Sequence, residues 1–148
     1  MKLAVIGAGL MGRAAVYDLS RAEGVEQVVV CDIDESLAKQ VADAYGNNIT
    51  QGGFLDASDE AAVYKWLKQF DAVVSCVTYK YNPGLTRAAI TAGCHFVDLG
   101  GNNDVVRTQL GMNDEAEKAG VVVIPDCGLA PGMVSVSYTH LRAHETND

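Results

Sequence analysis

Short apolar runs alternate with segments of helical periodicity along most of the chain. Between these runs, apolar residues recur at helical spacing, as Ala15, Val16 and Leu19 do after the first run. The apolar runs predict strands over 2–6, 28–31, 49–55, 71–77, 95–99 and 121–124. Six strands that alternate with helices favour a parallel sheet with right-handed crossovers. We therefore expect an α/β fold, a doubly wound Rossmann sheet with the strand order 3-2-1-4-5-6.

Polar residues mark where several of the predicted helices begin. Segments 34–36 and 58–60 carry acidic residues, which the positive end of a helix dipole favours. Asn82 followed by Pro83 resembles an N-cap with proline at the first helical position. Trp66 falls on the apolar side of a helical pattern, so we interpret it as a core residue rather than a ligand contact.

The turn after the first apolar run has the sequence Gly-Ala-Gly-Leu-Met-Gly at 7–12. Gly7 permits a tight turn out of the strand, Gly9 leaves room for a pyrophosphate beside the backbone, and Gly12 lets helix and strand pack closely. The helix that follows presents free N–H groups and a positive dipole end to the phosphates. Asp32 ends the second apolar run, twenty residues after Gly12, where it can accept hydrogen bonds from ribose hydroxyls. Strand, turn, helix and acid together predict a dinucleotide site.

Two other strand ends are expected to complete the cofactor site. Asp56 lies where the adenine ring would sit in this fold, and residues 76–79 follow the fourth strand. Tyr79 and Tyr81 either line the nicotinamide pocket or cover the end of the next helix. The predicted cofactor-binding residues are Gly7, Gly9, Leu10, Met11, Gly12, Asp32, Ile33, Asp56, Cys76, Val77, Thr78 and Tyr79.

Distinctive segments follow four of the predicted strands, at 7–12, 78–81, 98–103 and 126–132. In a parallel sheet these positions all lie at the carboxyl edge, where the ligands of α/β proteins bind. Loops that only joined strands to helices would not need unusual sequences on one edge. The clustering indicates that this edge carries the chemistry.

Composition restricts the class of protein but not its reaction. The 148 residues include 49% hydrophobic and 20% charged residues, as in ordinary globular domains. The net charge of −8 disfavours general binding to nucleic acid, and we expect no membrane span because every apolar run is short. The N-terminus does not have the organisation of a signal peptide, so a cytoplasmic location is the default expectation. The four cysteines have no metal-ligand spacing and are interpreted as reduced thiols: Cys31, Cys76, Cys94 and Cys127.

Three motifs occur together at this edge. They are Val-Ile-Gly-Ala-Gly-Leu-Met-Gly at 5–12, Asp-Leu-Gly-Gly-Asn at 98–102 and Ile-Pro-Asp-Cys-Gly-Leu-Ala-Pro-Gly at 124–132. Together they resemble the saccharopine dehydrogenase family, most closely its L-lysine 6-dehydrogenase type, from Met1 to about Val134. The resemblance implies an enzyme that oxidises the C–N bond at an amine of an amino acid. Hydride would pass to NAD, and an imine would form.

The same resemblance implies that the loops after the fifth and sixth strands face the nicotinamide and the substrate. The implied substrate-side residues are Asp98, Gly100, Gly101, Asn102, Asp126, Cys127 and Gly128. Catalytic roles stay unassigned, because the family's substrate contacts lie partly in a later domain. The implied partners are an amino-acid substrate and, for the complete enzyme, a second copy in a homodimer.

The expected domain division is a dinucleotide-binding domain over 1–134 and a non-native tail over 135–148. In the family, an α+β substrate and dimerisation domain follows the sixth strand, whereas this tail resembles translated adaptor or vector sequence. His140 and His144 have the spacing of a zinc pair on a helix, but a third ligand is missing, so no metal site is expected. We expect the fragment alone to bind cofactor without turning over substrate.

Two other functions fit part of the pattern. A nucleotide-sensing regulatory domain would share the glycine turn and Asp32 but would not need the motifs at 98–102 and 126–132. An amino-acid dehydrogenase of another branch would share only the first motif. NAD is expected rather than NADP, because a 2′-phosphate would lie beside Asp32 and Asp34 with no arginine in the next several residues.

Overall fold

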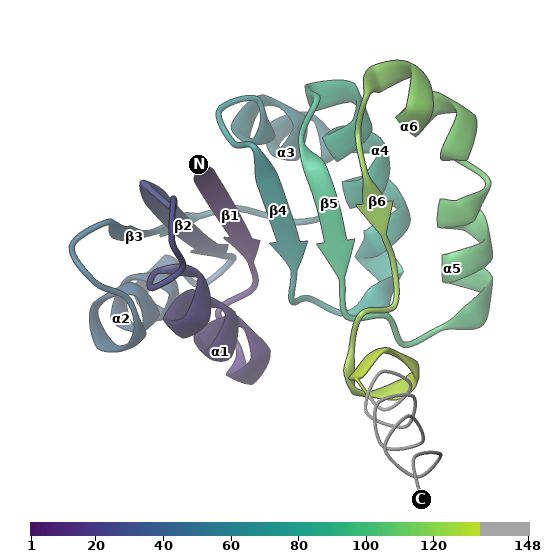
Figure 1. The fold of residues 1–148 in the computed structure, drawn as a ribbon. Helices are drawn as coiled ribbons and strands as arrows, with labels where there is room; N and C mark the ends of the chain where they lie inside the picture. Colours follow the sequence, from purple (N-terminus) through teal and green to yellow (C-terminus); the bar gives the residue numbers. More distant parts are fainter. Residues whose placement is uncertain (134–148) are drawn as a thin grey trace, which may run out of the picture.

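A six-stranded parallel sheet forms the centre of the computed structural model, which describes residues 1–133 (Figure 1). The strands are β1 (Lys2–Ile6), β2 (Gln27–Asp32), β3 (Thr50–Phe54), β4 (Ala72–Ser75), β5 (His95–Asp98) and β6 (Val123–Ile124). Their order across the sheet is β3-β2-β1-β4-β5-β6, and every neighbouring pair is parallel. This order confirms the doubly wound Rossmann topology predicted from the sequence.

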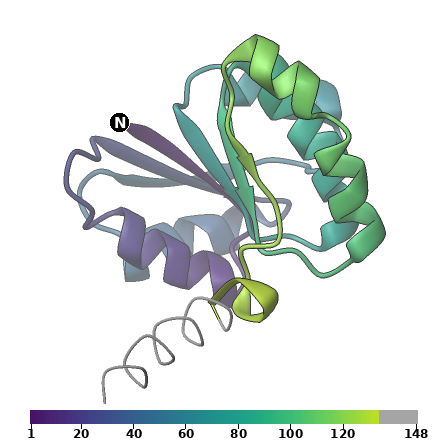
Figure 2. The ribbon, with the colours of Figure 1, turned by 45° about the vertical axis from the view of Figure 1, so that its right-hand side comes forward.

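Helices cover the sheet on both faces (Figure 2). The helical segments are α1 (Leu10–Leu19), α2 (Glu35–Tyr45), α3 (Glu60–Leu67), η1 (Tyr79–Tyr81), α4 (Asn82–Ala92), α5 (Asn103–Leu110), α6 (Asn113–Ala119) and η2 (Leu129–Met133). In Figure 2, α1 lies on one side of the sheet, and α4, α5 and α6 lie on the other. The segment 126–132, predicted as a loop, ends in the helical turn η2.

Each face of the sheet has its own apolar core, and β1 contributes to both. Leu3 and Val5 pack with residues of α1 and α2, whereas Ala4 and Ile6 pack with residues of α3 and α4. Phe96 of β5 is among the largest fully buried side chains. Burial on both faces is the reason the strands read as continuous apolar runs rather than as alternating ones.

Two predicted helix starts are confirmed by side-chain caps. The Asp34 carboxylate accepts the Leu37 backbone N–H at 3.1 Å, and the Asp59 carboxylate accepts the Ala62 N–H at 3.0 Å. Such caps satisfy donors that have no partner within the first helical turn. Trp66 is also where it was expected, since it packs against the apolar core with its ring centroid 4.7 Å from that of Phe70.

The prediction that Asn82 caps α4 is wrong. Asn82 is the first helical residue, Tyr81 is the N-cap, and the Asn82 side chain is buried. Its amide oxygen accepts the Ser75 hydroxyl at 2.8 Å. Ser75 lies on β4 and is also buried, so its hydroxyl needs a partner inside the protein. The sequence pattern showed a cap-like dipeptide but could not show the strand residue that faces it.

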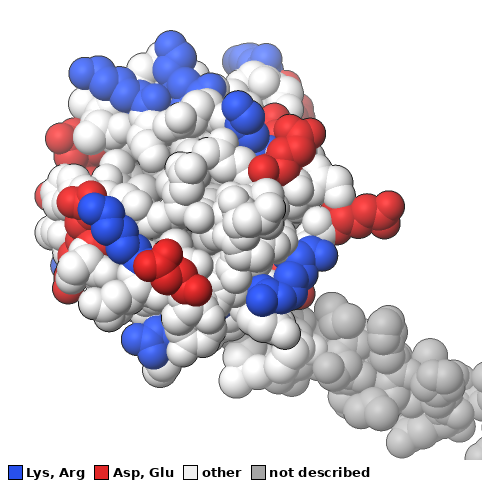
Figure 3. Space-filling view, turned by 90° about the vertical axis from the view of Figure 1, so that its left-hand side faces the viewer, with Lys and Arg blue, Asp and Glu red and all other residues white. Residues whose placement is uncertain are grey.

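The expected tail and its two histidines lie outside the described residues. Within residues 1–133, no helix has both the length and the apolar character needed to cross a bilayer. The face shown in Figure 3 carries basic and acidic side chains interspersed around an uncharged centre. The cysteines are unpaired thiols, as expected.

Candidate functional site at the carboxyl edge of the sheet

The glycine turn packs tightly against the neighbouring strand end. Gly7 has a φ of +101°, and a Cβ there would come within 3.0 Å of the Cys76 carbonyl group. A Cβ at Gly12 would overlap the Gly7 carbonyl oxygen. Gly9 differs from both, because a Cβ on it would meet nothing within 4 Å. Two of the glycines are therefore needed for packing, and Gly9 borders open space where a ligand could approach the backbone.

The N-terminus of α1 faces the same space. Gly9 is its N-cap residue, and no side chain in the described part of the chain caps this helix. Its first turn contains no acidic residue. Leu10 and Met11, both at the helix start, are exposed. Free backbone donors and the positive dipole end make this position suited to an anionic group such as a pyrophosphate.

Asp32 connects the glycine turn to the start of α2. One carboxylate oxygen accepts the Ala8 backbone N–H at 2.7 Å, and the other accepts the Asp34 N–H at 3.0 Å. Asp32 is half-buried at the end of β2. Each carboxylate oxygen can accept a second hydrogen bond. Asp32 can therefore hold the turn and still receive a hydroxyl of a ribose.

A cleft of about 90 Å³ opens between the ends of the first four strands. Asp32 lies on one wall, and Asp56 lies in the segment that follows β3. The Asp56 carboxylate accepts the Ser58 hydroxyl at 2.6 Å and the Ser58 N–H at 2.8 Å, and these bonds lower its pKa. The cleft is lined by Ile6, Gly7, Cys31, Asp32, Ile33, Leu55, Asp56, Ala57, Val77 and Tyr81.

The structure separates the two tyrosines that the sequence treated together. Tyr81 lines the cleft, whereas Tyr79 is exposed and lies beside the loop after β5. A Cβ at Gly101 would come within 3.2 Å of the Tyr79 ring. Cys76 is close to the glycine turn, and burial raises the pKa of its thiol to about 11. Thr78, which lies between Cys76 and Tyr79 in the sequence, is exposed.

The loops after β5 and β6 contact each other. A Cβ at Gly100 would overlap the Asp126 side chain, and one at Gly128 would overlap the Leu99 carbonyl oxygen. Gly100, Gly101 and Asp126 all have positive φ angles, of 73°, 122° and 63°. The close approach and the left-handed backbone explain why glycines occur here in both motifs. The loops expected to lie together do so.

Two expected substrate-side residues use their side chains within the protein. Asp98 is completely buried, and its carboxylate accepts only protein donors. Asn102 caps α5, because its amide oxygen accepts the N–H groups of Asp104 at 2.9 Å and Val105 at 3.1 Å. Both residues therefore shape the loop instead of projecting from it. Asp98 lies two residues after the buried Phe96 on the same strand, and this period-two placement was a signal for its burial.

Cys127 is the exposed thiol of the set. Partial burial raises its pKa, and the nearby Asp98 and Asp126 carboxylates act in the same direction. The thiol form is therefore favoured over the thiolate. Among residues 1–133, no three His, Cys, Asp or Glu side chains are placed to hold a metal ion.

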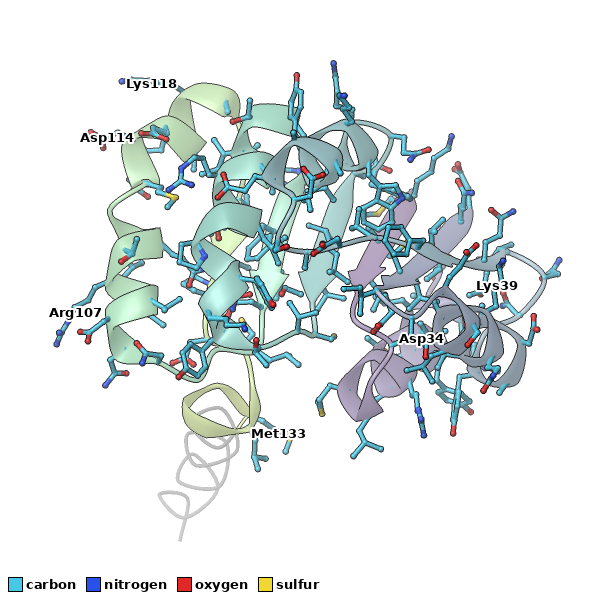
Figure 4. The ribbon with its side chains drawn as sticks, turned by 180° about the vertical axis from the view of Figure 1, so that it is seen from behind. Asp34, Lys39, Arg107, Asp114, Lys118 and Met133 are labelled. Atoms are coloured by element: carbon cyan, nitrogen blue, oxygen red, sulfur yellow. The ribbon has the colours of Figure 1, made fainter. Side chains whose placement is uncertain are left out.

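The site as a whole lies at one edge of the sheet. In Figure 4, Asp34 marks the start of α2 on one half, and Met133 marks the end of η2 on the other. The glycine turn, the cleft and the two contacting loops lie at the carboxyl ends of the strands between these points. Sequence reasoning missed Thr86 and Gln109, two buried polar residues of α4 and α5 that hydrogen-bond each other beneath the loops.

Known proteins share this arrangement. A family model described as the saccharopine dehydrogenase NADP binding domain matches residues 3–124. The chain belongs to this family. Over most of its length it is similar to the dinucleotide-binding domain of saccharopine dehydrogenases. The family predicted from the three motifs is confirmed, and the L-lysine 6-dehydrogenase type stays a prediction.

Two curated relatives of this saccharopine dehydrogenase-like domain are named saccharopine dehydrogenase [NADP(+), L-glutamate-forming]. The chain is 26% identical to the protein of Saccharomyces cerevisiae over 144 aligned residues, and this alignment covers 97% of the chain. It is 28% identical over 144 residues to that of Schizosaccharomyces pombe, which covers 96% of this chain. The chain spans only 30% and 29% of the length of these relatives.

Solved structures agree with the curated relatives. The apo histidine-tagged saccharopine dehydrogenase (L-Glu forming) from Saccharomyces cerevisiae superposes with a TM-score of 0.78 at 25% identity, over 98% of this chain and 30% of that one. A probable dehydrogenase from Thermotoga maritima has a TM-score of 0.63 at 19% identity, over 84% of this chain and 35% of that one. The second likeness shows a shared fold alone.

Proposed function

We propose that the chain is the NAD-binding domain of an oxidoreductase that acts on a CH–NH or CH–NH₂ group of an amino acid. L-lysine, as in L-lysine 6-dehydrogenase, and saccharopine are the candidate substrates. The observation that carries the proposal is that open space at Gly9, the uncapped start of α1 and the Asp32 carboxylate lie together at the carboxyl edge of the sheet, with Asp32 lining the cleft. The contacting loops at 99–102 and 126–128 border the same edge.

Each part of a dinucleotide can be matched to one region of the site. The cleft between Asp32 and Asp56 is suited to adenosine, and the start of α1 to the pyrophosphate. Residues 76–79 and the two contacting loops are then left for the nicotinamide end. When bound, the nicotinamide would accept a hydride from the carbon that carries the amine. The protein's own task is to hold that ring and exclude water from one side of it.

The charges around the end of β2 favour NAD over NADP. A 2′-phosphate would carry close to two negative charges beside Asp32. Hydrogen bonds from Ser36 and then from Leu37 lower the pKa of neighbouring Asp34, so that carboxylate is also ionised at neutral pH. Lys39 forms an ion pair with Glu35 at 2.7 Å, so its charge is already partly compensated. The relatives are named for NADP(+), and this chain is therefore proposed to differ from them in cofactor preference.

Titration calorimetry with NADH and NADPH on the 148-residue chain tests the proposal. We expect NADH to bind more tightly by about tenfold or more, which corresponds to about 1.4 kcal/mol. Equal or tighter binding of NADPH would contradict the role given to Asp32. Binding of neither would contradict the dinucleotide site itself.

A nucleotide-sensing domain, the alternative function, would bind the dinucleotide and transfer no hydride in any longer form of the protein. An amine dehydrogenase would transfer hydride once its substrate-binding part is present. Assays of the complete protein with L-lysine and saccharopine distinguish the two. The homodimer of the complete enzyme and the cytoplasmic location stay predictions, for which size-exclusion chromatography and cell fractionation are the measurements.

A further inference from the structure

Asp98 is a completely buried carboxylate in which both oxygens accept hydrogen bonds from the protein. One oxygen accepts the Gly100 N–H at 2.7 Å and the Asp126 N–H at 3.1 Å. The other accepts the Gln109 side-chain amide at 2.6 Å. The Asp98 backbone carbonyl also accepts the Cys127 N–H at 2.8 Å. A single residue at the end of β5 thus bonds to both loops and to α5.

The two loops depend on this residue for their mutual position. Gly100 and Asp126 donate to the same carboxylate oxygen, so the two donors must lie close together. Asp126 has a φ of 63°, which is costly for a residue other than glycine. Its hydrogen bond to Asp98 is one interaction that offsets this cost. Without the carboxylate, these partly buried N–H groups would lose their hydrogen-bond acceptor.

We propose that Asp98 is a positioning residue for the nicotinamide end of the dinucleotide site. It acts through the 99–102 and 126–128 loops, which it fixes relative to each other, and touches neither cofactor nor substrate itself. The inference rests on the proposed function, since it needs a dinucleotide at this edge. It replaces the expectation that the Asp98 side chain faces the substrate with a role inside the protein.

The hydrogen bonds of the Gln109 amide allow a conservative substitution of Asp98 as a test of this role. Its nitrogen donates to Asp98 and also to the Thr86 hydroxyl at 2.9 Å, whereas its oxygen is buried without a partner in the described part of the chain. In Asp98→Asn, the remaining oxygen can still accept from both loops. The new amide nitrogen would meet the Gln109 nitrogen, and a rotation of the Gln109 amide would turn its oxygen toward this new donor. Asp98→Asn should therefore keep the relative position of the two loops, which Asp98→Leu loses.

The experiment compares two ligands that differ only at the nicotinamide end. Calorimetric titration with NADH and with ADP-ribose separates the adenosine contribution from the nicotinamide contribution. We expect Asp98→Leu to weaken NADH binding by about tenfold, and to leave ADP-ribose binding within about twofold of the parent chain. Asp98→Asn should bind both ligands as the parent does. Thr86→Val is the matched control, because it alters the same buried network without touching either loop.

Five results decide the matter. Selective loss of NADH affinity in Asp98→Leu, with rescue in Asp98→Asn, supports the inference. An equal change for both ligands, or a Thr86→Val effect as large as that of Asp98→Leu, would reduce Asp98 to a general structural residue and overturn it. If the parent chain binds NADH no better than ADP-ribose, the loops do not hold the nicotinamide, and the inference fails while the dinucleotide site stands. If it binds neither ligand, the proposed function fails too.

Asp98→Leu removes the acceptor of one buried and two partly buried donors, so a second measurement uses the unaltered chain. Amide hydrogen exchange should show Gly100 and Asp126 protected together, well above the exposed Gly101 beside them. Exchange of both amides at the rate of Gly101 would show that the carboxylate does not fix the loops, and would overturn the inference without any variant.

Discussion

The carboxylate of Asp32 accepts the backbone N–H of Ala8 at 2.7 Å, so one side chain joins the end of β2 to the glycine turn that follows β1. Its second oxygen accepts the N–H of Asp34 at the start of α2. The acid expected to bind a ribose is therefore also part of the framework that shapes the phosphate site. A substitution at Asp32 changes both the ligand contacts and the turn.

We expect two substitutions of Asp32 to separate these roles. Asp32→Ala removes the side-chain acceptors of two backbone N–H groups, so the free energy of unfolding should fall by about 1–3 kcal/mol and NADH affinity by about tenfold. Asp32→Asn keeps an acceptor for one N–H but removes the charge. It should therefore raise the affinity for NADPH relative to NADH with a smaller loss of stability. Denaturant unfolding and calorimetry measure the two effects.

Asp43→Asn is the control for charge, since it removes a carboxylate from an exposed position on α2 outside the cleft. It should leave the ratio of NADPH to NADH affinity unchanged. If Asp32→Asn also left this ratio unchanged, the charge at residue 32 would not set the cofactor preference.

Two glycines of the turn should respond in opposite ways to the same substitution. Gly12→Ala places a methyl group against the Gly7 carbonyl oxygen, so we expect a loss of about 1–3 kcal/mol in unfolding free energy. Alanine normally stabilises a helix interior relative to glycine by about 1 kcal/mol, so even the sign of the change is informative. Gly9→Ala adds its methyl group in open space, and should fold normally but bind NADH more weakly. Thermal unfolding and calorimetry on both variants make the comparison.

The paired result is needed for the interpretation. Destabilisation by Gly9→Ala, or unchanged NADH affinity in a folded Gly9→Ala chain, would mean that the space beside Gly9 does not receive the pyrophosphate. Stabilisation by Gly12→Ala would show that α1 and the turn can separate without cost.

Acid should weaken the hydrogen bonds that Asp34 and Asp56 accept. Hydrogen bonds from Ser36 and Leu37 lower the pKa of Asp34, and those from Ser58 lower that of Asp56, both from an ordinary value of 3.8. A carboxylate with a lowered pKa stabilises the folded state above its ordinary value, and this contribution is lost as the pH falls through the lowered value. Thermal midpoints of Asp34→Ala and Asp56→Ala should therefore lie below that of the parent at pH 5–6 and converge with it in stronger acid, at about pH 2–3.

Asp43→Ala, an exposed acid outside these hydrogen bonds, serves as the reference for the pH series. A gap between parent and variants that stayed constant down to strong acid would mean that these hydrogen bonds do not depend on the charge of the two carboxylates.

The sequence predicted the arrangement of the sheet better than the direction of individual side chains. Three kinds of local signal predicted the structure correctly: the apolar runs, the helix caps at Asp34 and Asp59, and the glycine spacing. Each reflects a requirement of the local backbone, which does not change when the chain folds. The roles of Asn82 and Asp98 were different, because each depends on a distant partner. Ser75 faces Asn82 from a strand, and the loop after β6 reaches Asp98 across 28 positions of the chain.

Burial at a strand end was the particular difficulty. A carboxylate that ends a parallel strand lies at the ligand edge whichever way it points, so motif reasoning placed Asp98 beside the substrate. The strand period of two put it on the same face as Phe96, which is buried under α4. Gln109 gave no comparable signal, since a glutamine on a predicted helix is normally exposed.

We expect the 148-residue chain to bind NADH without sustained oxidation of an amino acid. The glycine turn, Asp32 and the cleft all come from residues 1–133, so the cofactor can bind here. Turnover further requires an amine that is deprotonated, held against the ring and shielded from water. Asp98 is buried among N–H donors, and the raised pKa of Cys127 keeps it a thiol, so neither is arranged as a base for the amine.

The chain spans 30% of the Saccharomyces cerevisiae relative, and we propose that the remaining length of such a protein supplies the substrate contacts. Loss of well-oriented reactants can remove roughly 7–11 kcal/mol of barrier reduction, which is many orders of magnitude in rate. The measurement is NADH absorbance with NAD and L-lysine or saccharopine at high concentrations of the chain, after calorimetry has shown that the dinucleotide binds. Steady production of NADH over many turnovers, lost in Gly9→Ala, would show that the strand-end loops described here suffice for catalysis and that no further domain is required.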